Sequence, residues 1–455
     1  MDKKGAVQNG EYQRGLTLRV TPPQILVMGF AAIILTGALL LTLPVSVQPG
    51  QEINFLTSLF TATSAVCVTG LVVVDTATNW TFFGQLVILL LIQVGGLGFM
   101  TMATFFAILL GRRIGLRQRL IIQESLNQTN VAGIVRLVRY VLLFTFISEF
   151  TAAVILSMRL SADLGVMKGI WYGLFHSVSA FNNAGFDLFG GFRSFTGYVD
   201  DITVNLCITT LIILGGIGFS VVVDVIRKFK TPRLLSLHSK LTLSVTGVLI
   251  LAGATLIYFL ELSNTLAPLS PTGKVLAAYF QAVTPRTAGY NTVDIGGLRS
   301  ATQFLIVILM FIGASPGSTG GGIKTTTTGI IAVSMLSMAR GKLDAEVFGR
   351  RIGQDQVYKA LAIVLLALTL VAVVSLLLSV TEKTDFLTVL FETTSAFGTV
   401  GLSMGVTPKL TAIGRILIIL TMFLGRVGPL TFAFAMAQSR RKTSLRFPEE
   451  KLMVG

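Results

Sequence analysis

Long apolar runs alternate with short polar segments along most of the chain. The runs cover residues 22–43, 80–110, 141–160, 202–226, 241–260, 301–338, 360–380 and 411–437. Each is long enough for an α-helix to cross a bilayer, which takes about 20 apolar residues. The first run has no small-residue cleavage site after it, so we expect a retained helix and not a signal peptide. The pattern therefore predicts eight membrane-spanning helices.

A shorter, semi-polar stretch lies between the two runs of each pair. The four stretches are 53–74, 169–188, 272–293 and 386–404. Each begins with a helical pattern that is too short to cross the bilayer, which fits a re-entrant helix. The repeated unit is thus a span, a short helix, an irregular segment and a second span. We expect four units, at 22–110, 135–228, 238–340 and 355–438.

Glycine motifs repeat on the same fourfold plan. Each short helix ends in a frame of Phe, three residues, Ser or Thr, Ala or Pro, and then a glycine. These glycines are Gly70, Gly185, Gly289 and Gly401, which are 115, 104 and 112 residues apart. A second glycine-rich motif lies in the second run of each pair and begins at Gly95, Gly215, Gly313 or Gly425. Glycine at these places lets a helix kink or another backbone approach.

The composition supports a membrane protein and argues against several other classes. Of the 455 residues, 53% are hydrophobic and only 13% are charged, whereas soluble domains have about 25% charged residues. Two cysteines, Cys67 and Cys207, and two histidines, His176 and His238, are too few for a disulfide framework or a histidine-built metal centre. A membrane-embedded enzyme would need clustered His, Cys or paired carboxylates. We therefore expect no enzyme.

The positive charge is concentrated in short segments. The net charge is +15, and 25 of the 36 Lys and Arg residues lie in 1–21, 111–140, 224–240, 339–359 and 439–455. These segments fall before odd runs or after even ones, as the positive-inside rule predicts for cytoplasmic loops. The pattern indicates a cell-membrane protein with cytosolic termini at 1–21 and 439–455, and it argues against a nucleic-acid partner.

The four irregular segments suggest a pore for cations. Non-helical backbone is tolerated in a membrane only where it is buried in protein or lines water, so four such strips are best arranged around one axis. Glycines with positive φ can aim carbonyl oxygens at that axis, where they replace the hydration shell of a cation. The predicted ion-binding residues are Val68, Thr69, Gly70, Asn183, Ala184, Gly185, Thr287, Ala288, Gly289, Thr399, Val400 and Gly401. We thus expect an all-α integral membrane fold with four fused span–pore helix–span units around one central pore.

The second run of the third unit contains an unusual segment. Residues 313–322 include five glycines, one proline and two serines, and glycine costs about 1 kcal/mol and proline about 3 kcal/mol at a helix position. A loop at membrane depth over 313–324, below the filter, is therefore expected. Its candidate gate residues are Gly313, Ser315, Pro316, Gly317, Ser318, Thr319, Gly320, Gly321, Gly322 and Lys324. The alternative is a simple kink that relieves helix packing.

Arg426 is the most informative single residue. It lies within an apolar run, and an intramembrane arginine is costly unless it faces a cavity or a partner. The repeat alignment puts it level with the glycine loop. It can therefore be a barrier charge, a latch that hydrogen-bonds the loop, or a structural ion-pair residue with Glu149 as its partner.

The fourfold unit, the four filter glycines and the broken third-unit span resemble the Trk/Ktr/HKT family of potassium transporters, over residues 22–438. The chain looks most like the membrane pore subunit of a bacterial Ktr system. The resemblance implies potassium uptake, often sodium-dependent, with potassium in the filter and gating by the 313–324 loop and Arg426. It also implies a homodimer on a cytosolic ring of RCK subunits, which bind the nucleotide. Glycine at all four filter positions resembles the potassium-type members.

Several alternatives remain open at this point. A sodium-coupled secondary transporter working by alternating access would also use repeats with broken helices, although two runs per unit give successive units one orientation, as a pore needs. Channel and ion-coupled symport are not distinguished. The basic loops around residues 112–119 and 350–351 and the C-terminal tail are candidates to dock the ring or to bind anionic membrane lipid.

Three further expectations concern polar residues near the filter. His176 and Glu392 share one repeat position and are expected to hydrogen-bond the pore-helix ends. Asp75, Asp187 and Asp294 follow their filter glycines and are candidates to attract cations at the outer mouth. Cys67 is expected to pack as a small apolar residue.

Overall fold

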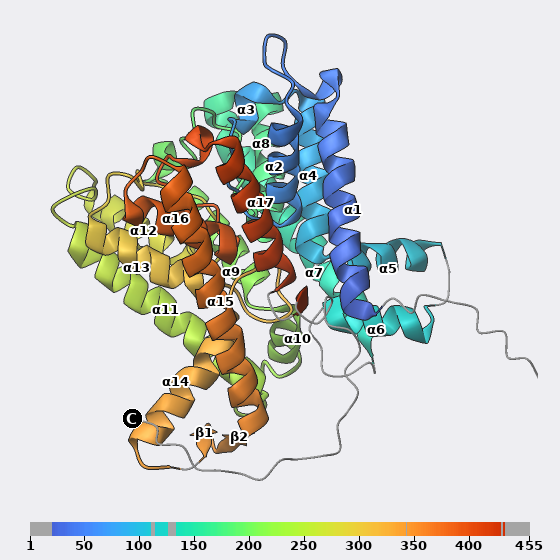
Figure 1. Ribbon diagram of the computed structural model, residues 1–455, viewed down its shortest axis with the longest axis vertical. Helices are drawn as coiled ribbons and strands as arrows, with labels where there is room; N and C mark the ends of the chain where they lie inside the picture. Colours follow the sequence, from blue (N-terminus) through green and yellow to red (C-terminus); the bar gives the residue numbers. More distant parts are fainter. Residues whose placement is uncertain (1–20, 111–113, 126–132, 343, 429–430, 433–455) are drawn as a thin grey trace, which may run out of the picture.

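The computed structural model describes residues 21–110, 114–125, 133–342, 344–428 and 431–432. These residues are mostly helical, with one antiparallel hairpin of β1 (Ala345–Val347) and β2 (Arg350–Ile352) (Figure 1). The prediction of a mostly helical chain with several apolar helices is confirmed. The terminal segments predicted to be cytosolic lie outside the described residues, apart from Thr21.

Four long apolar helices begin the four predicted units. They are α1 (Pro22–Thr42), α7 (Ile134–Leu164), α11 (Leu237–Glu261) and α15 (Gln354–Thr381). Among the described residues these are the four single helices that are long and apolar enough to cross a membrane, with mean hydropathy between 2.0 and 3.1. The start of α1 is set by Pro22, whose missing N–H suits the first turn, and by a capping box of Thr21 and Gln24.

A short helix follows each long one. These helices are α2 (Phe55–Val66), α8 (Val166–Phe181), α12 (Pro271–Val283) and α16 (Phe386–Gly398). Three begin at a side chain that accepts a backbone hydrogen bond, namely Asn54, Ser270 and Asp385. The fourth, α8, follows α7 directly at Gly165, whose positive φ of 81° reverses the chain. Each short helix ends just before a filter glycine.

The second apolar run of each unit is interrupted close to its glycine motif, where a kink or, over 313–324, a loop was expected. The number of eight spans stays a prediction. The runs contain α4 (Phe82–Leu97) with α5 (Phe99–Leu109), α9 (Ile202–Gly216) with α10 (Phe219–Arg227), α13 (Ser300–Phe311) with α14 (Thr325–Ala339), and α17 (Ala412–Val427). The breaks fall at Gly98, Gly218 and Gly428, which have φ of 80°, 98° and 91°, and at the predicted glycine loop. The axes of α9 and α10 differ by 97°. Counting that bent pair as one span, the described helices give up to five spans by length and composition.

The remaining elements are short. They are α3 (Thr76–Asn79), α6 (Leu116–Ser125) and the 3-10 helices η1 (Pro44–Ser46), η2 (Thr196–Tyr198), η3 (Pro232–Leu234) and η4 (Thr407–Lys409). The helix α10, the lower part of α14 and the hairpin β1–β2 lie at one end of the molecule, opposite α3 (Figure 1).

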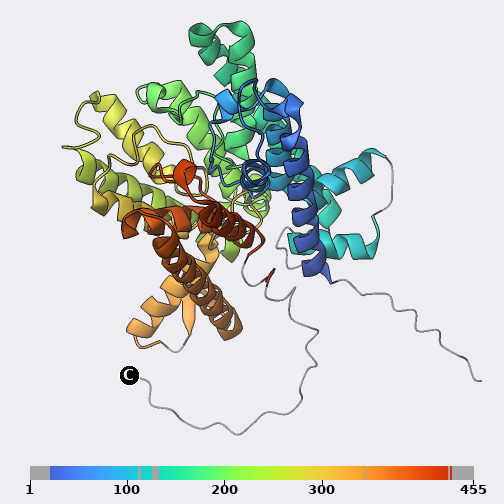
Figure 2. The same ribbon diagram turned by 45° about the horizontal axis from the view of Figure 1, so that its top comes forward.

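The four units follow one another around a common centre, as the sequence of colours in Figure 2 shows. The buried apolar clusters explain this arrangement. One joins Phe60 and Ile88 of the first unit to Phe175 of the second and Met422 of the fourth. Two others join the second unit to the third and the third to the fourth. Because each unit shares a core with its neighbours, the four units close into a ring.

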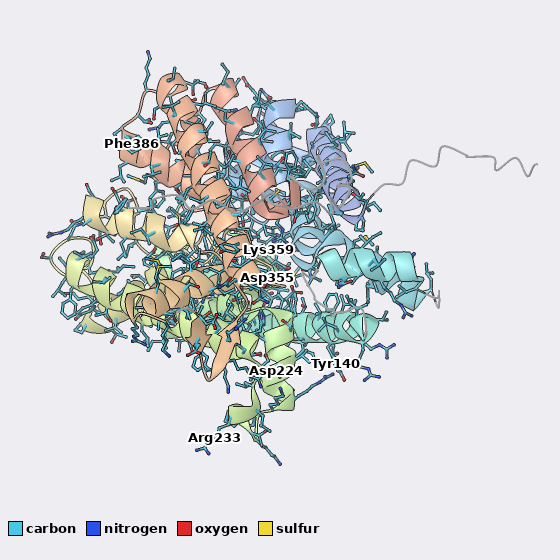
Figure 3. The ribbon with its side chains drawn as sticks, turned by 60° about the horizontal axis from the view of Figure 1, so that its bottom comes forward. Tyr140, Asp224, Arg233, Asp355, Lys359 and Phe386 are labelled. Carbon is cyan, nitrogen blue, oxygen red and sulfur yellow. The ribbon has the colours of Figure 1, made fainter. Side chains whose placement is uncertain are left out.

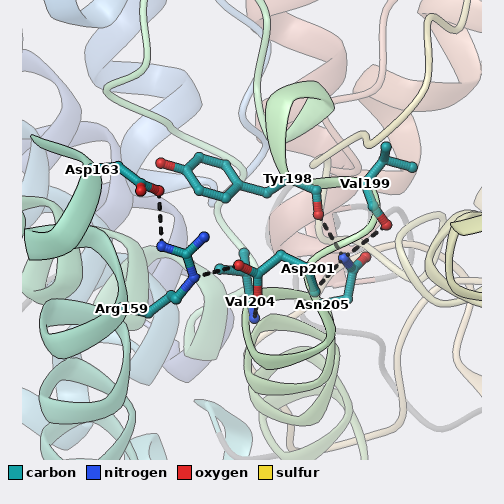
Figure 4. A network of polar contacts seen from close by, with 7 residues as sticks. All are labelled: Arg159, Asp163, Tyr198, Val199, Asp201, Val204 and Asn205. Carbon is teal, nitrogen blue, oxygen red and sulfur yellow. Dashed lines mark hydrogen bonds and ion pairs between the residues drawn. The ribbon is translucent and has the colours of Figure 1, made fainter. Parts of the chain in front are cut away.

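Polar clasps at the α3 end tie the long helix of a unit to its second run. In the second unit, Arg159 of α7 contacts Asp201 at 2.5 Å and Asp163 at 2.9 Å, and Asp201 caps α9 (Figure 4). In the third unit, Glu261 at the end of α11 accepts hydrogen bonds from Thr302 and from the backbone of Arg299. These contacts fix the spacing of the two helices that enclose each short helix.

Candidate functional site

The four repeated glycines lie next to one another in a closed ring. A Cβ added to Gly70 would lie within 2.7 Å of the carbonyl oxygen of the residue that precedes Gly185. A Cβ added to Gly185, Gly289 or Gly401 would likewise lie within 2.7 Å of the carbonyl oxygen of the residue that precedes the next glycine in the ring, and Gly401 leads back to Gly70. The oxygens belong to Ala184, Ala288, Val400 and Thr69. The ring follows the order of the units in the chain. A side chain at any of the four positions would therefore displace backbone of the next unit.

The backbone alternates in handedness as it approaches each glycine. The glycines have φ between 71° and 94°. Val68, Asn183, Thr287 and Thr399, each two residues earlier, also have positive φ, between 49° and 74°, although they are not glycine. In each strip, two residues with positive φ flank one residue without it. This alternation turns successive carbonyl groups to one side of the strip. Non-glycine residues hold this conformation only where their surroundings enforce it.

Thr69 does not occupy the same position in its repeat as the other hydroxyl and amide residues of the predicted filter. Counted from the glycine, Val68 is equivalent to Asn183, Thr287 and Thr399, and Thr69 lies one position later. All of these side chains are buried. Val68 contributes no polar side chain, so the ring of side chains below the carbonyl groups has three polar members.

A hydroxyl group from the repeat frame supports each strip, and the sequence analysis did not assign this role. Ser64 and Ser395 accept hydrogen bonds from the backbone N–H of Gly70 and Gly401, both at 3.0 Å. Ser179 exchanges bonds with the backbone of Phe186 at 2.9 and 3.1 Å, and Thr284 donates to the carbonyl oxygen of Tyr290 at 2.6 Å. The signal was present, because Ser or Thr stands at this frame position in all four repeats.

His176 and Glu392 support the chain that follows the ring. The Nε2 atom of His176 accepts from the N–H of Leu188 at 3.2 Å, while Nδ1 is 2.7 Å from the carbonyl oxygen of Tyr172. Glu392 accepts from the N–H of Met404 at 3.0 Å. Leu188 and Met404 each lie three residues after their glycine. Both side chains therefore hold the segment that follows the ring, whereas the sequence had predicted hydrogen bonds to the ends of the short helices.

The segment 313–322 is a loop that lies directly against the ring, so a simple kink does not describe it. Its Gly321 donates through N–H to the hydroxyl of Thr399 at 3.1 Å, and Gly320 packs against Thr287. Thr319 donates to the carbonyl oxygen of Phe181 at 3.3 Å. The loop thus contacts residues that precede the filter glycines of three units.

The other loop residues hold the loop against the broken second run of unit two. Ser315 and Thr319 donate through N–H to the carbonyl oxygens of Gly216 and Gly215, at 3.0 and 3.1 Å, and Gly317 accepts from Phe219 at 2.8 Å. Gly313 packs against Gly322, and Pro316 packs against Gly218. Ser318 donates to the carbonyl oxygen of Ser315, and Lys324 donates to that of Gly320 at 2.7 Å. Every predicted loop residue therefore belongs to one folded segment.

Arg426 connects this loop to the first unit. One terminal nitrogen donates to the carbonyl oxygen of Thr319, and the other donates to those of Gly95 and Gly96. The suggested partner Glu149 instead accepts hydrogen bonds from Gln93 and Asn182. Within the part of the chain that the structure describes, Arg426 forms no ion pair, and its guanidinium donates hydrogen bonds to backbone carbonyl oxygens.

A cavity of about 140 Å³ adjoins the loop and Arg426. Its lining includes Gly317, Ser318, Lys324, Arg426 and Phe219. Water takes about 30 Å³ per molecule in the liquid, so several waters fit. Lys324 and Arg426 therefore border a cavity that has room for water.

The three aspartates that follow the glycines accept hydrogen bonds from nearby backbone N–H groups, and Asp75 also contacts the second unit in this way. Asp75 accepts from Ala77, Thr78 and Phe192, Asp187 accepts from Phe189, and Asp294 accepts from Gly296. Burial, reinforced by the charge of nearby Asp75, raises the pKa of Asp187 to about 7. Cys67 is buried, as expected for a small apolar residue.

Comparisons with known proteins agree with this architecture. Residues 16–444 match the family model for TrkH, described as a cation transport protein. The chain is 47% identical over 442 residues to the Ktr system potassium uptake protein B of Bacillus subtilis, covering 96% of this chain and 98% of that protein. It is 41% identical over 444 residues to the potassium/sodium uptake protein NtpJ of Enterococcus hirae, covering 96% and 98%.

A solved structure has the same fold. The potassium transporter TrkH from Vibrio parahaemolyticus superimposes with a TM-score of 0.71 at 18% identity, covering 93% of this chain and 86% of that chain. With its several long apolar helices, this chain is a multi-pass membrane protein. It belongs to the TrkH family of cation transport proteins.

Proposed function

We propose that this chain is the potassium-selective, ion-translocating subunit of a potassium uptake system. The observation that carries the proposal is the closed ring of four glycines with positive φ, each packed against a carbonyl oxygen of the next unit. A relative that is 47% identical along nearly the whole chain is named a potassium uptake protein. The ring of glycines indicates the site, and the name of the relative indicates the cargo.

The filter works through carbonyl oxygens. Val68, Thr69 and Gly70, with the equivalent strips 183–185, 287–289 and 399–401, turn carbonyl groups toward the axis, and these groups replace the hydration shell of the ion. The four short helices end at this ring, so their partly negative C-termini favour a cation there. The hydroxyl groups of Ser64 and its equivalents keep the strips from collapsing inward.

The loop 313–324 is the gate in this proposal, and Arg426 is its latch. The loop lies against the ring, and Arg426 holds it to the first unit through Thr319, Gly95 and Gly96. Opening requires these hydrogen bonds to break and the loop to withdraw from Thr399. The glycines of the loop give it alternative conformations of similar energy.

Reconstitution of the purified protein in liposomes tests the function. An outward potassium gradient should drive flux that is faster than the flux of sodium under the matched sodium gradient. Measuring potassium flux with and without sodium also tests whether sodium stimulates uptake. Equal flux of the two ions, or flux that saturates at the slow turnover of an alternating-access carrier, would contradict the pore.

Regulation is proposed to come from outside the chain. In this proposal the chain forms a homodimer, its termini are cytoplasmic, and a cytosolic ring of nucleotide-binding subunits docks on its basic loops. Exposed arginines support a docking face, namely Arg119, Arg350 and Arg351. Arg233, which is also exposed, lies beyond Asp224 of α10 (Figure 3). The predicted contacts at 112–113 and in the C-terminal tail lie outside the described residues.

Reversing the charge of the hairpin tests the docking face. The double variant Arg350→Glu/Arg351→Glu should lose most of its co-purification with a Ktr-type regulatory subunit, because two charge pairs become repulsive. Lys168→Glu, at an exposed position near the start of α8, is the control and should keep the partner. Unchanged co-purification together with weaker binding to anionic vesicles would assign these charges to lipid headgroups.

Acidification should reduce uptake through Asp187. With a pKa of about 7, its carboxylate is charged at pH 8 and mostly neutral at pH 6, so the attraction of cations to the outer mouth falls as the pH falls. We expect Asp187→Asn to lose the pH dependence of potassium uptake between pH 6 and pH 8, measured at limiting potassium. At saturating potassium the parent and the variant should agree, and a difference that persists there would exclude a role in attracting ions.

A further inference from the structure

Glu149 is a buried acid that the proposed mechanism does not use. It lies in the middle of α7 and is 5% exposed. A carboxylate at membrane depth is costly and persists where it has a function or a partner. In the described part of the chain its hydrogen-bond partners are two neutral amides, those of Gln93 on α4 and Asn182 at the end of α8.

These three side chains form a closed triangle. Asn182 donates to Glu149 at 2.9 Å and to Gln93 at 3.0 Å, and Gln93 donates to the second oxygen of Glu149 at 3.3 Å. Every edge of the triangle pairs a donor with an acceptor. Each oxygen of the Glu149 carboxyl group accepts one amide N–H, so an acidic side chain suits the corner that receives two donors.

Asn182 brings this triangle to the filter. It is the C-cap of the short helix α8 and directly precedes Asn183, which has a positive φ of 57°. Its side chain packs against Gly96 so closely that a Cβ would not fit there. Gly96 also accepts a hydrogen bond from Arg426. The triangle therefore joins the second filter strip to the part of α4 that receives the latch.

We propose that Glu149 is a positioning residue for ion selection, which acts through Asn182 and Gln93 to hold the second filter strip at its distance from the first unit. This inference rests on the proposed potassium filter. Glu149 makes no contact with the ring itself, so its effect on selectivity is indirect. Buried polar networks fix the relative positions of the groups that they join. Here the amide nitrogen of Asn182 also donates to the carbonyl oxygen of Val178 on α8 at 2.9 Å, while its Oδ1 packs against Gly96 and has no hydrogen-bond partner among the described residues.

The hydrogen-bond pattern allows a sharp test by exchange. Glu149→Gln keeps the shape of the side chain but presents an amide N–H₂ to the amide of Gln93 or Asn182, which leaves one buried donor without an acceptor. Gln93→Glu alone places two carboxyl groups side by side. The double variant Gln93→Glu/Glu149→Gln restores a donor and an acceptor on every edge, with the carboxylate moved to α4.

The measurement is the ratio of potassium to sodium flux in liposomes that hold equal amounts of folded protein. Glu149→Gln should lower this ratio about five- to tenfold, the factor that one lost buried hydrogen bond gives. The double variant should recover the ratio of the parent to within about twofold. Asn182→Ala should lower the ratio as much as Glu149→Gln, and combining these two changes should lower it no further.

Three outcomes overturn the proposal. An unchanged ratio in Glu149→Gln shows that the triangle does not set selectivity. A lowered ratio that the double variant leaves unrestored shows that a carboxylate is needed at position 149 itself. If neither Glu149→Gln nor Asn182→Ala yields folded protein, the triangle is a folding element and the proposal is likewise wrong. A parent protein that does not select potassium refutes the filter, which is a separate result.

Discussion

Replacing Gly289 by serine should lower the ratio of potassium to sodium uptake about tenfold or more. The residue has a φ of 80°, which costs an L-amino acid about 1–2 kcal/mol. Its new Cβ would also meet the carbonyl oxygen of Val400 and the backbone of Gly401. A carbonyl group that must move no longer matches the dehydrated ion. Uptake by potassium-starved cells, measured with and without competing sodium, gives the ratio.

Gly405 offers a matched control. It has a φ of 85° in the same part of the fold, but a Cβ there would meet nothing within 4 Å. Gly405→Ser therefore carries the same backbone strain without the collision and should keep the selectivity of the parent. If each of the variants Gly70→Ser, Gly185→Ser, Gly289→Ser and Gly401→Ser were expressed normally and transported like the parent, the filter assignment would be wrong.

Arg426→Gln should raise potassium flux through the purified protein about tenfold in the absence of a regulatory subunit. The change removes the guanidinium that bonds Thr319, Gly95 and Gly96. Hydrogen bonds to charged groups contribute about 1.5–3 kcal/mol each, and losing even one of these shifts a closed–open equilibrium by about a factor of ten. Flux in liposomes, compared at equal protein, measures the change.

Arg415→Gln is the control for the latch. Arg415 lies on the same helix and also donates to backbone carbonyl oxygens, those of Leu410 and Pro408, but at the other end of α17. It should leave flux unchanged. Deleting residues 317–321 should raise flux more than Arg426→Gln does and make it less dependent on the regulatory subunit. A folded deletion variant with unchanged, still regulated flux would mean that the loop is a packing element.

The features that sequence alone could predict are those that repeat or that break a strong local rule. The chain has 46 glycines, and nothing about Gly289 alone distinguishes it from the others. The sequence frame around it recurs in three other places, and this repetition identifies the four glycines of the ring. The 313–322 loop stands out because no apolar helix tolerates that composition. Arg426 stands out because its neighbours are apolar. In each case the signal is local and does not depend on knowing the fold.

The breaks at Gly98, Gly218 and Gly428 could not be predicted with the same certainty. The residues around them are apolar, so hydropathy runs through each break without a change. Glycine disfavours helix by only about 1 kcal/mol, and packing decides whether the helix bends or continues. At Gly95 and Gly215 the backbone at the ends of the short helices, Val66 of α2 and Phe181 of α8, approaches too closely for any side chain.

The triangle of Gln93, Glu149 and Asn182 lay beyond sequence reasoning for a different reason. Asn182 is 33 residues from Glu149 and 89 from Gln93, and each residue comes from a different helix. The opposite charges of Arg426 and Glu149 suggested an ion pair, but the tertiary fold gives each of them separate partners. Only the positions of four packed units decide which polar groups meet.

The joint between the first and fourth units has a consequence for how the protein is made. Arg426 and Gly95, which meet there, are 331 residues apart in the chain, and Gly401 packs against Thr69. A ribosome that delivers the units in order leaves the first unit with an open flank until α17 has been synthesised. The ring can therefore close only after α17 has been synthesised. Until then the polar strip of unit one faces lipid or whatever insertion machinery shields it.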